Sequence, residues 1–373
     1  MDDIMNSKLI VRVIFFLVAL AACTAVGPAV RAKGTQRWSA AAAWKWYHRQ
    51  SWLAGCNYIP SNADNTLEMW QGATFSPAII HRELGFAHRL GFNVIRVFLH
   101  YLVWNHNPAA MKQRMRTFLK IASHEHIRVI FVLFDDCWKP VAHLGPQPQP
   151  IPGVHNSQWV QCPGPAMISD RKQWPELKAY EQGVIRAFGK DKRVLCWDIY
   201  NEAGNSGNGL KTLPLLKQTF RWARACQPRQ PLTACIWQGP KDAIRTFVLS
   251  HSDVITFHNY SGPHNLQREI TRLKRLHRPL ICTEYMRRPV STFAKCMPVF
   301  KRNDVGCLNW GLTNGRTQTI YPWGSKPGTP PPALWFHNIL HRDGSPFSVR
   351  EVHLIERLTG AAMWPSEKQK KPT

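Results

Sequence analysis

The sequence predicts an α/β fold, a single (β/α)8 TIM barrel, and three observations point to it. Eight short apolar runs alternate with stretches whose apolar residues recur at helical spacing. Most of these runs are continuously apolar, as expected for parallel strands that are buried on both faces. No G-x-G-x-x-G or phosphate-binding loop is present, which argues against an open nucleotide-binding sheet. Eight strands that are each followed by a helix close into a barrel.

The elements follow one another in a regular order. The predicted strands are Leu53–Ile59, Phe92–Leu99, Arg128–Phe134, Val194–Tyr200, Leu232–Trp237, Val254–Asn259, Leu280–Glu284 and Gly306–Trp310. The predicted helices are Pro77–Leu90, Met111–Ser123, Leu177–Phe188, Leu213–Cys226, Asp242–Leu249, Leu266–Leu276, Thr292–Phe300 and Arg350–Leu358. Gly91 follows the first of these helices and suits its C-terminal cap.

One connection, from Asp135 to Pro175, is long and lacks periodicity. The part of it between Pro140 and Pro165 holds seven prolines. Long loops inside a domain are usually functional or disordered, and this one follows the third strand, on the face where barrel active sites form. We expect it to form a cleft wall to which Trp138 and Trp159 contribute. A surface excursion is the alternative.

The N-terminus has the features of an export signal. Lys8 and Arg12 precede an apolar run of ten residues, Val13–Ala22, which is too short to span a bilayer. We expect residues 1–32 to be a signal peptide and residues 33–373 to be the barrel domain of a secreted or periplasmic protein. Leu20-Ala21-Ala22-Cys23 also resembles a lipobox, in which a lipidated Cys23 would anchor the protein to a membrane. A chance cysteine in a discarded peptide is the other interpretation.

Nine cysteines follow the leader. Five of them lie in the apolar strand runs, where a free thiol behaves as a small hydrophobic group. Cys137 and Cys162 flank the long loop, and export permits a disulfide between them. No C-x-x-C pair or histidine cluster has metal-ligand spacing, so the sequence suggests neither a metal site nor a cofactor.

The formal net charge is +25, from 48 Lys and Arg against 23 Asp and Glu. The basic residues are spread over helical segments such as Lys112–Lys120 and Arg268–Arg278, and no nucleic-acid motif accompanies them. We therefore expect a solvated basic surface on a monomer, with no nucleic-acid partner. Attraction to acidic glycans is the alternative, and a basic surface-interaction protein is a third hypothesis for the whole chain.

Two glutamates stand at the ends of apolar strands. Glu202 closes Trp197-Asp198-Ile199-Tyr200-Asn201-Glu202, and Glu284 closes Ile281-Cys282-Thr283-Glu284. In a barrel both side chains project into the same C-terminal mouth. Glycoside hydrolysis requires such a pair, in which one carboxyl protonates the leaving oxygen and the other attacks the anomeric carbon. The carboxyl groups of a retaining enzyme lie roughly 5 to 5.5 Å apart.

With these residues, essentially the whole mature chain resembles the clan A glycoside hydrolases, especially cellulase-like family five. The resemblance implies that Glu202 is the acid/base and Glu284 the nucleophile. It also implies that Asn201 binds the sugar 2-hydroxyl, Arg96 supports the nucleophile, His258 and Tyr260 form the His-x-Tyr pair, and Trp310 is the aromatic floor. A cation and a phenol beside Glu284 favour its ionised form, which a nucleophile needs.

The chain departs from the family pattern after the third strand. Family five usually has a histidine there, whereas this sequence has Asp135-Asp136-Cys137-Trp138, so one aspartate is expected to grip sugar hydroxyls instead. Asn57, Tyr58 and Asn314 are further cleft candidates. The predicted function is a retaining β-glycosidase acting on a polysaccharide or oligosaccharide, like a cellulase, mannanase or xylanase. An exo-acting β-galactosidase or β-glucosidase and a non-catalytic carbohydrate-binding barrel are the alternatives.

Overall fold

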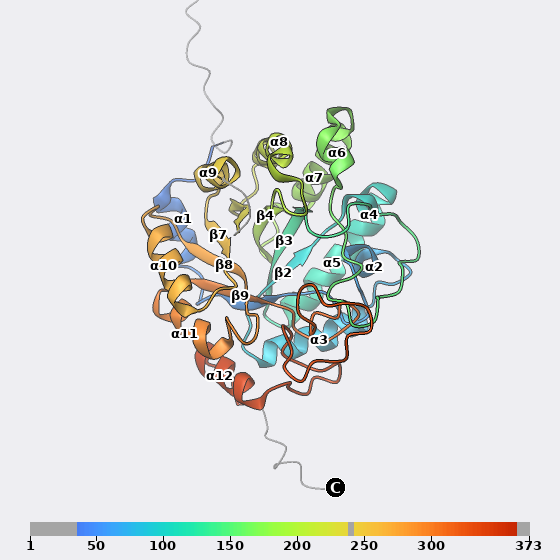
Figure 1. The fold of residues 1–373 in the computed structure, drawn as a ribbon. Helices are drawn as coiled ribbons and strands as arrows, with labels where there is room; N and C mark the ends of the chain where they lie inside the picture. The colour runs from blue at the N-terminus through green and yellow to red at the C-terminus, as the bar shows by residue number, and fades with distance from the viewer. Residues whose placement is uncertain (1–35, 238–241, 364–373) are drawn as a thin grey trace, which may run out of the picture. The chain divides into compact units, whose positions relative to one another are not determined.

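The structure, a computed structural model, describes residues 36–237 and 242–363, and parallel strands stand at its centre (Figure 1). The predicted signal peptide at 1–32, with the possible lipidation site Cys23, lies outside the described residues. Within the described part, no helix combines the length and the apolar character that a membrane crossing requires.

All eight predicted strands are present. They are β1 (Ala54–Asn57), β2 (Val94–Phe98), β3 (Arg128–Asp135), β4 (Val194–Asn201), β5 (Leu232–Thr233), β6 (Cys235–Ile236), β7 (Ile255–His258), β8 (Leu280–Tyr285) and β9 (Gly306–Trp310). The order in the sheet is β5-β4-β3-β2-β1-β9-β8-β7-β6, and all the strand pairs are parallel. β5 and β6 are two halves of one predicted strand that Ala234 interrupts. Because β5 pairs with β4 and β6 with β7, this strand closes the barrel.

The predicted helices surround the strands (Figure 1). They are α3 (Pro77–Arg89), α5 (Pro108–His124), α7 (Trp174–Phe188), α8 (Leu213–Ala225), α9 (Asp242–His251), α10 (Pro263–Lys274), α11 (Phe293–Arg302) and α12 (Val349–Thr359). Side-chain caps explain where several of them begin: Ser76, Asn107, Thr292 and Ser348 each accept a hydrogen bond from a backbone N–H of the first turn. Each prediction agrees with its helix to within a few residues.

Gly91 is needed where α3 ends. Its φ of +71° is in the left-handed region, which favours glycine. A Cβ on Gly91 would also lie 2.4 Å from the Thr359 hydroxyl oxygen at the end of α12. Both the backbone conformation and the close approach of α12 therefore require a glycine here.

Four short α-helices were not predicted: α1 (Ala40–Tyr47), α2 (Thr66–Trp70), α4 (Tyr101–His106) and α6 (Pro165–Ser169). Of these, α1 has a clear structural role. Its Ala43 and Tyr47 pack in one cluster with residues at the beginnings of the strands, including Val94, Leu195 and Ile281. This helix therefore covers the N-terminal end of the barrel and leaves the C-terminal end for the site.

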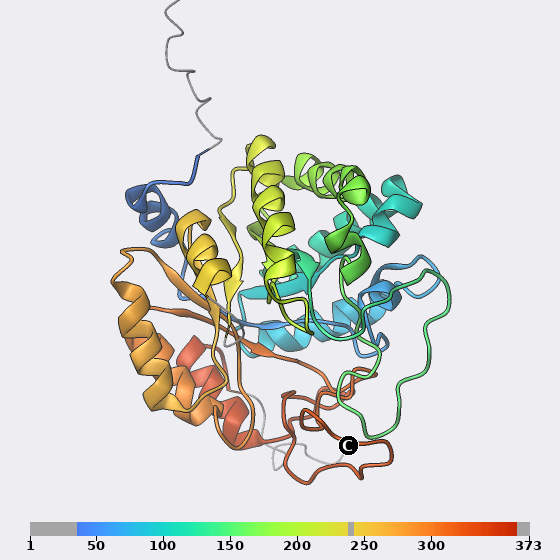
Figure 2. The ribbon, with the colours of Figure 1, turned by 45° about the horizontal axis from the view of Figure 1, so that its top comes forward.

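Two long connections lie side by side at the C-terminal end (Figure 2). The first is the predicted loop after β3, and the second, residues 311–348 between β9 and α12, was not singled out in the sequence. Hydrogen bonds join them: the Asn156 N–H donates to the Thr317 carbonyl at 2.8 Å, and the Gly328 N–H donates to the Pro152 carbonyl at 2.9 Å. The two loops stabilise each other as one wall.

Candidate active site

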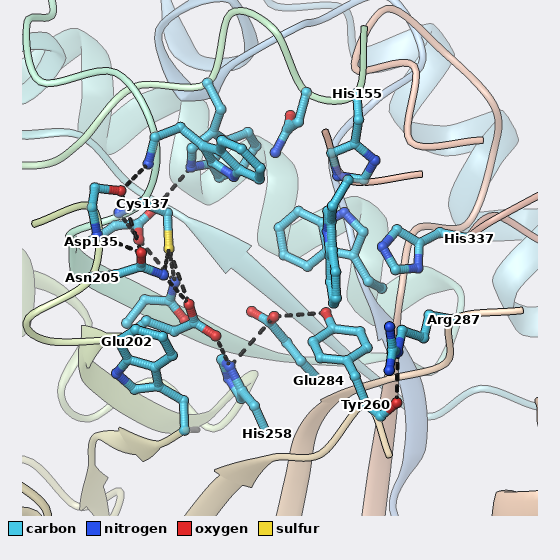
Figure 3. Close-up of a pocket in the computed structure, with 18 residues that line it drawn as sticks. Asp135, Cys137, His155, Glu202, Asn205, His258, Tyr260, Glu284, Arg287 and His337 are labelled. Atoms are coloured by element: carbon cyan, nitrogen blue, oxygen red, sulfur yellow. Dashed lines mark hydrogen bonds and ion pairs between the residues drawn. The ribbon is translucent and has the colours of Figure 1, made fainter. Parts of the chain in front are cut away.

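A cleft of about 470 Å³ opens at the C-terminal ends of the strands (Figure 3). Carboxylates, histidines and tryptophans dominate its walls. Its lining residues are Asp135, Cys137, Trp138, His155, Asn156, Trp159, Asn201, Glu202, Asn205, Ser206, Trp237, His258, Tyr260, Glu284, Arg287, Trp310, Trp323 and His337. Glu202 and Glu284 therefore face one cavity, as their positions at strand ends predict.

The two glutamates are close together. One carboxylate oxygen of Glu202 lies within 4.8 Å of one of Glu284. His258 Nδ1 lies between them, 2.7 Å from Glu202 Oε1 and 3.4 Å from Glu284 Oε2. This is the short spacing that direct attack requires. The separation of about 9 Å that leaves room for an intervening water in some inverting enzymes is absent.

A buried arginine and a tyrosine hold the Glu284 carboxylate. Arg96 Nη1 donates to Glu284 Oε1 at 2.9 Å, and the Tyr260 hydroxyl donates to Oε2 at 2.9 Å. Arg96 itself is fully buried on β2, where it also donates to Asp198, Asn57 and Asn201. This network fixes the guanidinium beneath the cleft, beside one oxygen of Glu284.

Glu202 has different partners. Its Oε2 accepts a hydrogen bond from Asn205 Nδ2 at 2.5 Å and lies 3.4 Å from the Cys137 thiol. The residue has a φ of +42°, a conformation that an ordinary side chain adopts at a cost and that is often found at functional sites. The Gly204 N–H donates to the buried Asp136 carboxylate at 2.7 Å, which ties down the turn that presents Glu202.

These surroundings act differently on the ionisation of the two carboxyls. Burial raises the pKa of both Glu202 and Glu284, and carboxyls this close do not both ionise at low cost. Burial also lowers the pKa of His258 to about 3, so its ring is neutral near neutral pH. Arg96 contacts Glu284 directly, and within the described residues no cation contacts Glu202. The contact with Arg96 therefore favours the charge on Glu284 over the charge on Glu202.

Asn205 can be tested as the residue that positions and tunes Glu202. Its N–H donates to the ionised form of Glu202 and so lowers the pKa of that carboxyl. In Asn205→Ala the pKa rises further, so Glu202 holds its proton to higher pH. We expect the basic limb of a kcat/KM profile to move to higher pH. Asn156→Ala is the matched control, since Asn156 also lines the cleft and its side chain is hydrogen-bonded to neither Glu202 nor Asn205. A limb that stays in place or moves to lower pH would refute this role.

Two of the candidate substrate contacts, Asp136 and Asn57, do not line the cleft. Asp136 is fully buried and points away from the cleft, where it accepts hydrogen bonds from Tyr200, Gly204 and Thr212. Asn57 is buried beneath the floor, where it accepts from Arg96 and donates to backbone carbonyls of Thr283 and Asn309. Both residues support the site from behind, as Arg96 does, and none of the three lines the cleft.

Most of the remaining candidate residues line the cleft. Asn201, His258, Tyr260, Trp310 and Asp135 line the cleft, and so does Trp138, which is 42% exposed. Asp135 is nevertheless occupied by hydrogen bonds from Trp159, Asn201 and Cys137, and burial raises its pKa to about 6.

Trp159 also reaches the cleft, but its ring is only 2% exposed and packs edge-on against Trp310. It supports the floor and is not an open stacking surface. Tyr58 is buried against Glu83, and Asn314 does not line the cleft.

Cys137 and Cys162 are both free thiols. Cys137 Sγ faces Glu202, whereas Cys162 Sγ accepts a hydrogen bond from the Tyr101 N–H on the other side of the loop base. The disulfide considered from the sequence is therefore not formed. The backbone ladder between Asp135 and Cys162 holds the loop base instead.

Two groups of side chains in the described part lie close enough together to share a cation: Glu202, His258 and Glu284 in the cleft, and His81, His124 and Glu125 on the outside. In the cleft, Arg96 already balances the charge of Glu284, and His258 Nδ1 is hydrogen-bonded to Glu202. The charges of the cleft group are thus balanced by the protein's own residues.

The sequence interpretation missed part of the wall. Trp237 follows β6, Arg287 follows β8, and Trp323 and His337 belong to the second long loop. Trp323 is 41% exposed and forms an edge-on contact with Tyr260. The Tyr-Pro-Trp segment at 321–323 and the proline-rich stretch after it are the signals that could have identified this loop.

No protein-family model matches the sequence, and no curated protein sequence matches it. Several solved structures, however, are similar to this structure. The exo-beta-1,4-mannosidase Op5Man5 from Opitutaceae bacterium strain TAV5 is 15% identical, with a TM-score of 0.57. That match covers 90% of this chain but 63% of the mannosidase, so the chain spans less than two thirds of that protein's length.

Two further structures match with similar scores. A GH5_18 variant from Streptomyces cattleya in complex with Manβ1-4GlcNAc is 13% identical, with a TM-score of 0.58 over 86% of this chain and 82% of that one. A Bacteroidetes-affiliated GH5 cellulase linked with a polysaccharide utilization locus is 12% identical, with a TM-score of 0.55 over 86% and 93%. At these identities the matches establish the fold, and they confirm the predicted barrel.

Proposed function

We propose that this protein is a retaining β-glycoside hydrolase with Glu284 as nucleophile and Glu202 as acid/base. The observation that supports this most is the asymmetry of a close carboxyl pair. Arg96 and Tyr260 stabilise the charge on Glu284, whereas no cation among the described residues contacts Glu202. Each carboxyl is thus in the protonation state that its role needs at the start of the reaction.

The proposed reaction has two displacements. Glu284 attacks the anomeric carbon, and Glu202 gives its proton to the leaving oxygen, so a covalent glycosyl-enzyme forms. Esterification removes the negative charge of Glu284, which lowers the pKa of Glu202 and lets it accept a proton from water. The activated water then attacks the anomeric carbon from the face that the leaving group vacated. Two inversions give net retention.

The walls of the cleft support a carbohydrate substrate. Trp310 lies on the floor, and the partly exposed Trp138 and Trp323 lie on the walls, so flat apolar rings face the space where sugar C–H groups would pack. By their names, two of the similar structures are a β-1,4-mannosidase and a cellulase. We propose a β-linked hexose oligosaccharide or polysaccharide as the substrate class.

The stereochemistry of the product tests this proposal. Proton NMR during the first turnovers of an aryl β-glycoside should show the β-anomer of the free sugar before mutarotation produces the α-anomer. An initial α-anomer would mean inversion and would contradict the double displacement. If no glycoside is hydrolysed but oligosaccharides bind, the non-catalytic alternative holds.

A further inference from the structure

Among the described residues, the cleft contains one cation whose charge the nearby side chains do not balance. Arg287 lies two residues beyond β8 and lines the cleft. Its Nε donates to the Tyr260 carbonyl at 2.9 Å, and its guanidinium lies over the Trp323 ring, 5.6 Å from the centroid. Within the described residues, no carboxylate forms an ion pair with Arg287, and neither Nη atom has a hydrogen-bond acceptor.

The next residue shows the contrast. Arg288 is buried, pairs with Glu351 at 2.5 Å, and donates to the carbonyls of Trp335, His337 and Asn338. Arg288 is therefore fully used in holding the second long loop. Arg287 instead presents two vacant donors to the cleft, in the fork geometry that recognises planar anions.

The carboxylates of the cleft are paired with other residues and do not neutralise Arg287. Arg96 compensates Glu284, and hydrogen bonds from Trp159 and Asn201 occupy Asp135. The rings of His155 and His337 are neutral, because burial lowers the pKa of each. The positive charge of Arg287 is thus left for a ligand, in a protein whose net charge of +25 attracts polyanions as a whole.

The position of Arg287 tells which part of a sugar it would meet. In Figure 3, Glu202 and Asn205 lie on one side of Glu284, and Tyr260, Arg287 and His337 lie on the other. Asn201, next to Glu202 in the chain, is the proposed partner of the 2-hydroxyl. C2 and the ring oxygen flank the anomeric carbon on opposite sides. A sugar that binds with its 2-hydroxyl at Asn201 would therefore direct its C5–C6 arm toward Tyr260 and Arg287.

We infer that the sugar bound next to Glu284 carries an anionic group on C6 and that Arg287 is the residue that selects it. This inference rests on the proposed function. A hexuronate carboxylate matches the two Nη donors as a planar, bidentate partner, and a 6-sulfate offers the same charge. The Trp323 ring beside the guanidinium keeps water away from one side of the pair and strengthens it.

Paired substrates test the inference. Aryl β-glycosides of gluco, galacto and manno configuration are each assayed as the neutral hexoside, the hexuronide and the 6-sulfate. For at least one configuration, the wild type should favour an anionic form by about 100-fold in kcat/KM, the size expected for a hydrogen-bonded charge pair. A preferred hexuronide identifies the carboxylate, and a preferred 6-sulfate identifies the sulfate.

Variants then assign the preference to Arg287. In Arg287→Ala the anionic-to-neutral ratio should collapse toward one, and in Arg287→Lys, which keeps the charge but not the fork, it should be intermediate. Arg302→Ala is the matched control, because it removes one exposed charge from α11 outside the cleft, and its ratio should match the wild type. Thermal unfolding shows whether each variant folds. The lysine variant gives the answer if the alanine variant does not fold.

Binding separates this inference from the proposed function. Calorimetry with the same glycosides in a Glu284→Gln background, in which no glycosyl-enzyme can form, measures affinity without turnover. Anion-selective binding that depends on Arg287, without hydrolysis by the parent enzyme, would refute the proposed function and keep the inference. Hydrolysis with a preference for neutral hexosides, an anionic preference that persists in Arg287→Ala, or no binding of any glycoside would overturn the inference.

Discussion

Glu284→Ala is expected to lower kcat on every glycoside by roughly 10⁵-fold or more, since removing a nucleophile abolishes the covalent route. A better leaving group does not restore activity, because Glu284 acts on the anomeric carbon and not on the leaving oxygen. Steady-state rates on an activated aryl glycoside and on an oligosaccharide measure this. Glu176→Ala, which removes an exposed carboxyl on α7, is the matched control and should keep near-wild-type rates.

Azide makes the test of Glu284 specific. In Glu284→Ala the small anion fits where the carboxylate was and attacks the anomeric carbon from the same face. One displacement inverts the centre, so the product is the α-glycosyl azide. Product NMR identifies the anomer. Wild-type activity in Glu284→Ala would remove this residue from the mechanism, and a β-glycosyl azide would mean that it is the acid/base.

The barrel could be predicted because its signals are local. A strand buried on both faces must be continuously apolar, and a helix that packs on it must be apolar at every third or fourth residue. The glutamates followed from the same argument, since parallel strands end at one edge of a barrel. Glu202 and Glu284 lie at the C-terminal ends of their strands. Their positions in the sequence were therefore enough to place both side chains at the mouth of the barrel.

For two adjacent residues at a strand end, the sequence does not show which side chain points into the cleft. Asp135 and Asp136 follow one another, and successive side chains in a strand point to opposite sides. Asp135 reaches the cleft, and Asp136 turns outward to Thr212 and Gly204. The sequence located both aspartates at the mouth but could not show which of them points inward.

The cleft residues that the second long loop supplies could not be predicted, because contacts between residues far apart in the sequence determine how this loop folds. Trp323 and His337 reach the cleft because two contacts hold the second long loop. One is the hydrogen bond between Asn156 of the first loop and Thr317, and the other comes from Arg288, three residues beyond β8. Neither interaction leaves a periodic trace in the sequence. Aromatic residues in an aperiodic, proline-rich segment can pack inward or outward, and Trp159 shows the inward outcome.

Glu202→Ala should have an effect that depends on the leaving group. On oligosaccharides, whose leaving oxygen needs a proton, we expect kcat/KM to fall by roughly 10³- to 10⁴-fold. On aryl glycosides with acidic phenols, Glu284 still attacks the anomeric carbon at a useful rate, because these leaving groups depart as phenolates without a proton. The second step then stalls without a base to activate water, and the glycosyl-enzyme accumulates. Stopped-flow measurement should show a burst of phenol, and intact-protein mass spectrometry should show the added sugar.

Azide should restore turnover of Glu202→Ala with the opposite anomer to that from Glu284→Ala. Azide needs no base, and it enters the space that the Glu202 carboxyl leaves beside Asn205 and Cys137. It attacks a sugar that Glu284 has already inverted once, so the second displacement gives the β-glycosyl azide. An α-glycosyl azide from Glu202→Ala would reverse the two roles. Wild-type turnover of oligosaccharides by Glu202→Ala would show that another residue supplies the proton.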